Sequence, residues 1–142
     1  MDIRGKNALV LGGFGLVGSA VCRELLVHEP AQLVVASLFK GEAEQAIAEL
    51  KQDFPNSKTT LIPAWGDVFL RAEWQSEEGF ARPGVLADPE KRHRLVHDIV
   101  GEMDADVLAS SLLAQLIEGR AEGFGGPADI VVDCINISTE VA

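Results

Sequence analysis

The chain has 142 residues, 47% of them hydrophobic, and carries a formal net charge of −10 at pH 7. This length predicts one domain, residues 1–142, with a single core, and the acidic balance argues against nucleic acid or an anionic membrane surface as a partner. No apolar run approaches the roughly 20 residues of a membrane span and no signal-peptide pattern precedes the first apolar segment, so we expect a cytoplasmic protein without a membrane span.

The first predicted element is a strand from Ala8 to Leu11, whose consecutive apolar residues are typical of a parallel sheet with both faces covered. A run of glycines follows this strand and leads into a predicted helix that begins at Val17. The predicted buried face of that helix consists of Val17, Val21, Leu25 and Leu26.

The glycine run fits the dinucleotide-binding fingerprint in two registers, Gly13-x-Gly15-x-x-Gly18 and Gly12-x-x-Gly15-x-x-Gly18. Gly12 or Gly13 allows the tight turn, while Gly15 allows close approach of a phosphate. Gly18 allows the helix to pack against the strand, and the helix dipole favours an anion at the turn. The predicted cofactor-binding residues here are Gly12, Gly13, Phe14, Gly15, Leu16, Val17 and Gly18, with Phe14 and Leu16 flanking the cofactor. The alternative is a purely structural turn.

The second predicted strand runs from Gln32 to Ser37, and its end is where a Rossmann fold usually carries an acid that bonds the adenosine ribose hydroxyls. Ser37 occupies that position, and Lys40 follows three residues later. Because an acid there would repel a 2′-phosphate, its absence tilts the predicted cofactor toward NADP rather than NAD, although Glu42 and Glu44 follow closely. The alternative is that Ser37 and Lys40 are ordinary loop residues.

A second amphipathic helix is predicted from Gly41 to Asp53, and a third strand from Thr59 to Trp65. The apolar stripe of this helix consists of Ala43, Ala46, Ile47 and Leu50. Three strands with two intervening helices make one βαβαβ mononucleotide-binding half.

The glycine run, Gly66-Asp67-Val68 after the third strand and the apolar segment from Ala128 to Asn136 together resemble the N-terminal part of a short-chain dehydrogenase/reductase, of the extended or atypical type. The resemblance covers residues 1–68 and about 108–139. It implies an α/β Rossmann-like parallel sheet of strand order 3-2-1-4, flanked by helices. It also implies the NAD(P)-binding portion of an oxidoreductase or epimerase/dehydratase, which transfers hydride between the nicotinamide and a carbinol or carbonyl carbon of a small-molecule substrate.

The resemblance further implies which residues lie beside the cofactor. In that family the Asp-Val pair after the third strand contacts adenine, which gives this role to Asp67 and Val68. The end of the fourth strand lies beside the cofactor, and we expect Cys134, Ile135 and Asn136 to line the inner ribose there. These three residues depart from the family's usual Asn-Ala-Ala or Asn-Asn-Ala-Gly.

The family's usual catalyst is a Tyr-x-x-x-Lys pair with a Ser or Thr, and this chain contains no tyrosine. The catalytic residues therefore stay unassigned, and we expect the proton donor to lie outside this sequence. Ser138 and Thr139 come too early for the family's catalytic serine, and they border the nicotinamide ribose or begin a loop. The missing tyrosine equally suits the alternative function, a non-catalytic dinucleotide sensor that signals through a partner.

Residues 69–106 do not match a minimal Rossmann crossover and are predicted to be an inserted loop and helix. Within them, residues 71–84 show no period, which predicts either a loop that binds or covers something, or a surface excursion or oligomer contact. Asp88 is the predicted N-cap of a helix that ends near Val100, and a further helix from about Asp104 to Gly119 leads to the fourth strand.

His93 and His97 share one face of the first of these helices, a spacing that can hold a metal. No third ligand is evident in the sequence, so we predict a solvated helix face and no metal site. The two cysteines, Cys22 and Cys134, also lack metal-site spacing and are predicted to be reduced buried thiols.

The fourth strand, Ile130-Val131-Val132, is apolar throughout, yet the strand order 3-2-1-4 would leave it at an open edge. Lysine or proline usually protects such an edge, and neither is present in this run. The sheet is therefore predicted to be incomplete on this side, with the remaining strands supplied by a C-terminal segment of a longer protein or by another chain.

Overall fold

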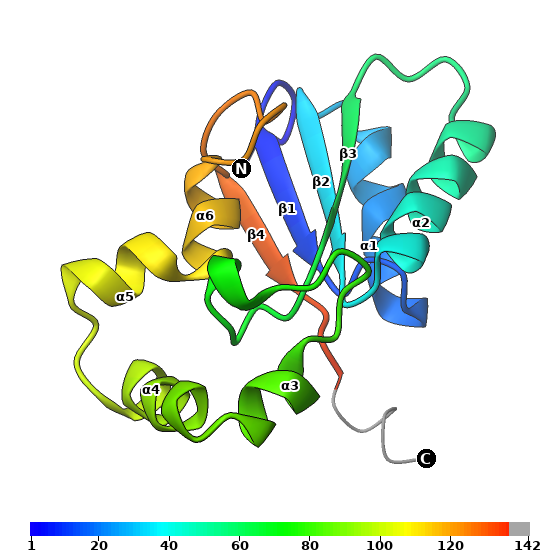
Figure 1. The fold of residues 1–142 in the computed structure, drawn as a ribbon. Helices are drawn as coiled ribbons and strands as arrows, with labels where there is room; N and C mark the ends of the chain where they lie inside the picture. The colour runs from blue at the N-terminus through cyan, green and yellow to red at the C-terminus, as the bar shows by residue number, and fades with distance from the viewer. Residues whose placement is uncertain (137–142) are drawn as a thin grey trace.

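Four parallel strands form one sheet in the order β3-β2-β1-β4 in the computed structural model, which describes residues 1–136 (Figure 1). The strands are β1 (Asn7–Leu11), β2 (Gln32–Ser37), β3 (Thr60–Trp65) and β4 (Ile130–Asp133). In register, Ala8 of β1 lies opposite Leu33 on one side and Ile130 on the other. The predicted strand order is confirmed; Ser138 and Thr139 lie outside the described residues.

Both faces of the sheet are buried, because consecutive apolar residues of β1 and β2 point to opposite sides. Helices α1 (Leu16–Val27) and α2 (Lys40–Asp53) cover one face, and α6 (Leu112–Glu118) covers the other (Figure 1). On the first face the core consists of Ala8, Val10, Cys22, Leu25, Leu26, Leu33, Val35, Ala46, Ile47 and Leu50. On the second face it consists of Leu9, Leu11, Val34, Ala36, Ala64 and Leu116. The predicted α/β architecture flanked by helices is confirmed.

Helix α1 buries Leu25 and Leu26 as predicted, but its first turn differs from the prediction. Gly18, Cys22, Leu25 and Leu26 are buried, whereas Val17 is exposed. The prediction for Val17 is wrong because Gly18 and Cys22, four positions apart, form the face of α1 that packs inward, with Gly18 against the glycine turn. Val17 lines the pocket described below instead.

Residues 69–106 fold into η1 (Ala72–Trp74), α3 (Arg82–Ala87), α4 (Pro89–Val100) and the start of α5 (Ala105–Ser110). This excursion, as we call residues 69–106 from here on, has a small core of its own made of Leu70, Val85 and Leu95. Asp88 caps α4 as predicted, since its carboxylate accepts hydrogen bonds from the N–H groups of Glu90 and Lys91. Figure 1 shows α3 and α4 beyond the carboxyl ends of the strands.

A buried arginine joins the elements of the excursion. Arg71 donates from Nε and Nη2 to the two carboxylate oxygens of Asp98 on α4, at 2.7 and 2.8 Å, and from Nη2 to Asp106 on α5 at 3.0 Å. The hydrogen bonds that Arg71 donates to Asp98 are the largest cause raising the pKa of the Arg71 guanidinium, and burial opposes them. Arg71 and Arg94 in turn lower the pKa of Asp106. The Arg71 side chain therefore links the segment that begins η1 to both α4 and α5.

The helix predicted over about 104–119 is two helices, α5 and α6, separated at Ser111. The Ser111 hydroxyl accepts a hydrogen bond from the Ala114 N–H and caps α6, while the backbone at Ser111 is extended. A serine that bonds the backbone in this way competes with continuation of the helix. Leu108, on the first of the two helices, is exposed.

Strand β4 lies at the edge of the sheet and, among the described residues, pairs with β1 alone. Val131 on this strand is 42% exposed. Cys22 is buried as predicted, but Cys134 is only half-buried because it follows the edge strand. Within residues 1–136, no helix has both the length and the apolar character that crossing a membrane would require.

Candidate functional site

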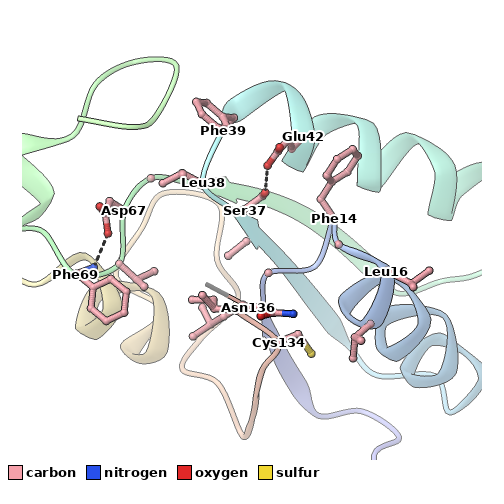
Figure 2. Close-up of a pocket in the computed structure, with 18 of the residues that line it drawn as sticks. Phe14, Leu16, Ser37, Leu38, Phe39, Glu42, Asp67, Phe69, Cys134 and Asn136 are labelled. Carbon is pink, nitrogen blue, oxygen red and sulfur yellow. Dashed lines mark hydrogen bonds between the residues drawn. The ribbon is translucent and has the colours of Figure 1, made fainter. Parts of the chain in front are cut away.

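A pocket of about 480 Å³ opens at the carboxyl ends of the strands, where the strand order reverses between β1 and its two neighbours (Figure 2). This edge is where open α/β sheets bind their ligands, and the volume is typical of a small-molecule site. The lining residues are Leu11, Gly12, Phe14, Gly15, Leu16, Val17, Ala36, Ser37, Leu38, Phe39, Glu42, Gly66, Asp67, Val68, Phe69, Arg82, Cys134, Ile135 and Asn136.

The glycine turn is held by backbone hydrogen bonds from β2. The N–H groups of Gly12 and Gly13 both donate to the carbonyl of Ala36, at 2.9 and 3.0 Å. Gly12 has φ +73°, a conformation that favours glycine, and a Cβ there would lie 2.8 Å from the carbonyl oxygen of Cys134. The turn is therefore pressed against the end of β4 as well as β2.

The other glycines of the turn divide into two kinds. Gly13 and Gly18 are not among the residues that line the pocket. A Cβ on Gly13 would meet Val35 at 2.4 Å, and one on Gly18 would meet the Gly12 carbonyl oxygen at 2.0 Å. These two glycines permit packing. A Cβ on Gly15 would meet only the Gly12 carbonyl oxygen, at 3.6 Å, and Gly15 lines the pocket.

Helix α1 begins at this turn with its N-terminus open to the pocket. In the described structure no side chain caps it at Gly15, and its first turn holds no acidic residue. The first N–H groups of a helix lack partners within the helix, and the helix dipole adds partial positive charge there. The first turn of α1 therefore offers N–H donors to an anion in the pocket.

Apolar side chains are exposed around this opening. Leu16 is 89% exposed and Val17 63%, and Phe39, Phe69 and Ile135 are also substantially exposed. All five line the pocket. Exposed apolar groups gathered around a cavity mark a surface that a ligand covers.

At the end of β2 the pocket meets a carboxylate rather than a lysine. The Ser37 hydroxyl donates to Glu42 Oε2 at 2.5 Å, and both residues line the pocket (Figure 2). Lys40, predicted as a cofactor contact, does not line it, and its Nζ lies 5.5 Å from the centroid of the Trp65 ring. Residues two apart on a helix point in nearly opposite directions, so α2 cannot bring both Lys40 and Glu42 to the same pocket.

At the end of β3, Asp67 is buried and both of its carboxylate oxygens are engaged. Oδ1 accepts from the Phe69 N–H at 3.0 Å, and Oδ2 accepts from Arg82 Nε at 2.7 Å. The Arg82 guanidinium also lies over the Phe69 ring, 5.7 Å from its centroid. Asp67 and Val68 both line the pocket, and Asp67 ties the excursion to it.

The excursion makes further contacts at the same edge. The Lys40 N–H donates to the carbonyl of Glu78, and Trp65 Nε1 donates to that of Glu77. The rings of Phe39 and Phe80 lie 5.8 Å apart. The aperiodic segment 71–84 thus runs along the ends of β2 and β3 and contributes Arg82 to the pocket wall.

At the end of β4, the Cys134 N–H donates to the carbonyl of Leu11, which places Cys134, Ile135 and Asn136 along the pocket. Burial raises the pKa of the Cys22 thiol to about 12, and burial followed by Asp133 raises that of Cys134. Both thiols are therefore protonated at neutral pH and poor nucleophiles.

His93 and His97 lie on α4, away from the pocket lining, and both are exposed. Within residues 1–136, no three His, Cys, Asp or Glu side chains are grouped so as to hold a metal ion.

Sequence reasoning missed several lining residues, among them Leu38, Phe39, Phe69 and Arg82. The first three are sequence neighbours of predicted residues, and a wider window around each strand end would have found them. Arg82 carries no local signal, because it lies fifteen positions from Asp67, the buried acid with which it forms an ion pair at the pocket. Glu42 was noted as a neighbouring acid, but nothing in the sequence placed it in the pocket.

No protein-family model matches the chain. It is 25% identical over 130 residues to Alcohol dehydrogenase 1 of Ceratitis cosyra, an alignment that covers 84% of this chain and 50% of that protein. The chain thus spans about half the length of the curated relative it matches.

Two solved structures are also similar to the chain. One is the ligand-free form of 5-ketofructose reductase of Gluconobacter sp. strain CHM43, with a TM-score of 0.39 and 23% identity, covering 46% of this chain and 22% of that one. The other is L-sorbose reductase from Gluconobacter frateurii complexed with NADPH and L-sorbose, with a TM-score of 0.42 and 20% identity, covering 73% and 33%. At these scores the fold assignment rests on the strand order itself.

The sequence similarity, the 3-2-1-4 sheet and the glycine turn agree with one another. This chain therefore has a Rossmann-like fold and is similar in sequence to part of an alcohol dehydrogenase.

Proposed function

We propose that this chain binds a nicotinamide dinucleotide at the carboxyl edge of its sheet, as the NAD(P)-binding portion of an oxidoreductase or epimerase/dehydratase. The observation that carries the proposal is the uncapped N-terminus of α1, which opens with the glycine turn onto a pocket of about 480 Å³. Backbone N–H groups and a helix dipole aimed at one cavity suit a pyrophosphate. These N–H groups and the dipole act locally, so they can attract an anion even though the chain's formal net charge is −10.

The pocket has a place for each part of the cofactor. The pyrophosphate lies against Gly15 and the first turn of α1, and the adenosine ribose lies beside Ser37. The adenine lies against Asp67 and Val68, with Leu38 and Phe69 as further apolar walls. The inner ribose lies along the strand end formed by Cys134, Ile135 and Asn136. These placements are supported by the segments that line the cavity, because each proposed contact lies among them.

A bound nicotinamide supplies hydride transfer at its C4 atom to or from a carbinol or carbonyl carbon. The residues of this chain bind the dinucleotide, orient it and exclude water from its adenosine end. The similarity to an alcohol dehydrogenase supports the redox class of the reaction. Since the chain has no tyrosine, proton transfer to the substrate is assigned to residues outside it.

The test is a titration of the purified chain with NADH and NADPH, followed by nicotinamide fluorescence. Gly15→Trp fills the space next to the α1 N-terminus and should abolish binding. The matched control is Gly84→Trp on α3, where a Cβ meets nothing within 4 Å and which does not line the pocket. Circular dichroism checks that both variants are folded. Absence of binding by the wild type, or equal binding by the two variants, would contradict the proposal.

A non-catalytic dinucleotide sensor is the second candidate, favoured by the absence of tyrosine. It predicts the same binding without turnover. Oxidation of NADH by the natural gene product in the presence of a carbonyl substrate panel would exclude it.

A further inference from the structure

The Glu42 carboxylate of helix α2 lies beside the position proposed for the adenosine ribose. Glu42 lies in the first turn of α2, and its Oε2 accepts the Ser37 hydroxyl at 2.5 Å at the end of β2 (Figure 2). No side chain in the described residues caps α2, so Glu42 is not engaged in capping the helix. Ser37 instead fixes the carboxylate at the pocket wall.

From this arrangement we propose that Glu42 makes the pocket select NAD over NADP, an inference that rests on the proposed function. A carboxylate oxygen accepts hydrogen bonds from the 2′- or 3′-hydroxyl of a ribose, and such charge-assisted bonds are the strong ones. A 2′-phosphate at the same place has no proton to offer at neutral pH and adds about two negative charges facing Glu42. Glu42 thus contributes from α2 the acid that β2 lacks, and Ser37 is the residue that positions it.

The cations near this site do not offset that repulsion. Lys40 lies over the Trp65 ring and outside the pocket lining. Arg82 is the cation among the described lining residues, and its Nε is ion-paired with the buried Asp67 at 2.7 Å. Glu42 and Asp67 against Arg82 leave one negative charge in excess on the lining. The charges of the described lining therefore favour a ribose hydroxyl over a phosphate.

The test compares NADH and NADPH titrations of the wild-type chain with those of Glu42→Gln and Glu42→Lys. We expect the wild type to bind NADH at least about tenfold more tightly than NADPH, the discrimination expected of a hydrogen bond to a charged group. Glu42→Gln should reduce the ratio to within about threefold, and Glu42→Lys should invert it. The matched control is Glu44→Gln, an exposed acid on the same helix that does not line the pocket and should leave the ratio unchanged.

Ser37 is tested by the same ratio. Ser37→Ala releases the Glu42 carboxylate and should lower the NADH preference, and Ser37→Thr, which keeps the hydroxyl, should restore it. A merely structural role of Ser37 would change stability and leave the ratio of the two affinities unaltered.

The outcomes separate this inference from the proposed function. If the wild type binds neither nucleotide, the proposed function fails and the inference fails with it. If it binds both and Glu42→Gln leaves the ratio unchanged, the site stands and the inference is overturned. If it prefers NADPH and Arg82→Gln removes that preference, Arg82 rather than Glu42 reads the 2′ position.

Discussion

The glycine turn and the excursion border the same pocket, but they are held there by different kinds of contact. The turn is held by backbone groups, with Gly12 and Gly13 donating to Ala36 and Gly18 lying against Gly12. The excursion is held by charged side chains, Arg71 with Asp98 and Arg82 with Asp67. The glycine turn therefore requires residues without side chains, whereas the excursion requires charged side chains that form ion pairs.

The largest effect is expected from adding one methyl group to the turn. A Cβ at Gly18 would lie 2.0 Å from the Gly12 carbonyl oxygen and 2.8 Å from the Gly13 Cα, both backbone atoms of a turn fixed by β2. Gly18→Ala should therefore lower the free energy of unfolding by about 4 kcal/mol or more, measured by urea denaturation. Gly41→Ala is the control, because a Cβ there meets nothing within 4 Å and alanine favours a helix by up to about 1 kcal/mol. Equal effects of the two substitutions would show that the turn is not closely packed.

The next effect is expected from removing one charge in the excursion. Asp98→Asn keeps the shape but leaves the Arg71 guanidinium, whose side chain is only 8% exposed, without its bidentate carboxylate. Breaking one partner of a buried ion pair costs about 3 kcal/mol. Glu73→Gln, which changes an exposed partner of the same arginine 3.7 Å away, should cost less than about 0.5 kcal/mol. Limited proteolysis should show cleavage within residues 69–106 for Asp98→Asn before the sheet unfolds, and cleavage in the sheet first would contradict this division.

The same contrast explains what the sequence could predict. The strand at Ala8, the glycines and the helix after them are adjacent in the chain, and each has a local physical signal, so the residues themselves predict the strand and the turn. The strand order has no such local signal and was implied by the resemblance to short-chain dehydrogenase/reductases. Apolar periodicity likewise identified the buried residues of α2. Local signals suffice where the contacts are made by neighbouring backbone.

The sequence could not predict the features that depend on one residue of register or on a contact between residues far apart in the chain. The apolar period predicts Val17 on the buried face, but Val17 is exposed and lines the pocket. Lys40 and Glu42 are separated by less than a turn of α2, and only the three-dimensional start of the helix shows which of them meets the pocket. Arg82 is fifteen positions from Asp67, and no spacing rule connects them. The break at Ser111 depends on a serine cap that the apolar period did not reveal.

The smallest change in stability is expected from adding a cap to helix α1, whose N-terminus differs from that of helix α4. In the excursion, α4 begins at Asp88, whose carboxylate accepts the first N–H groups of the helix, whereas α1 begins at Gly15 with no such cap. The backbone at Gly15, with φ −63° and ψ 171°, is an N-cap conformation that aspartate adopts readily. Gly15→Asp should therefore raise the free energy of unfolding by about 0.5 kcal/mol through the cap and the helix dipole.

The same carboxylate would occupy the place proposed for the pyrophosphate, so Gly15→Asp should abolish NADH binding while it stabilises the fold. Gly15→Asn is the control, since it caps the helix without the charge and should weaken binding less. Thermal unfolding measured alongside the NADH titration separates the two effects. A Gly15→Asp chain that binds NADH with wild-type affinity would show that the open end of α1 is not where the phosphates bind. A variant that is more stable and no longer binds would indicate that α1 is left uncapped because its ligand provides the cap.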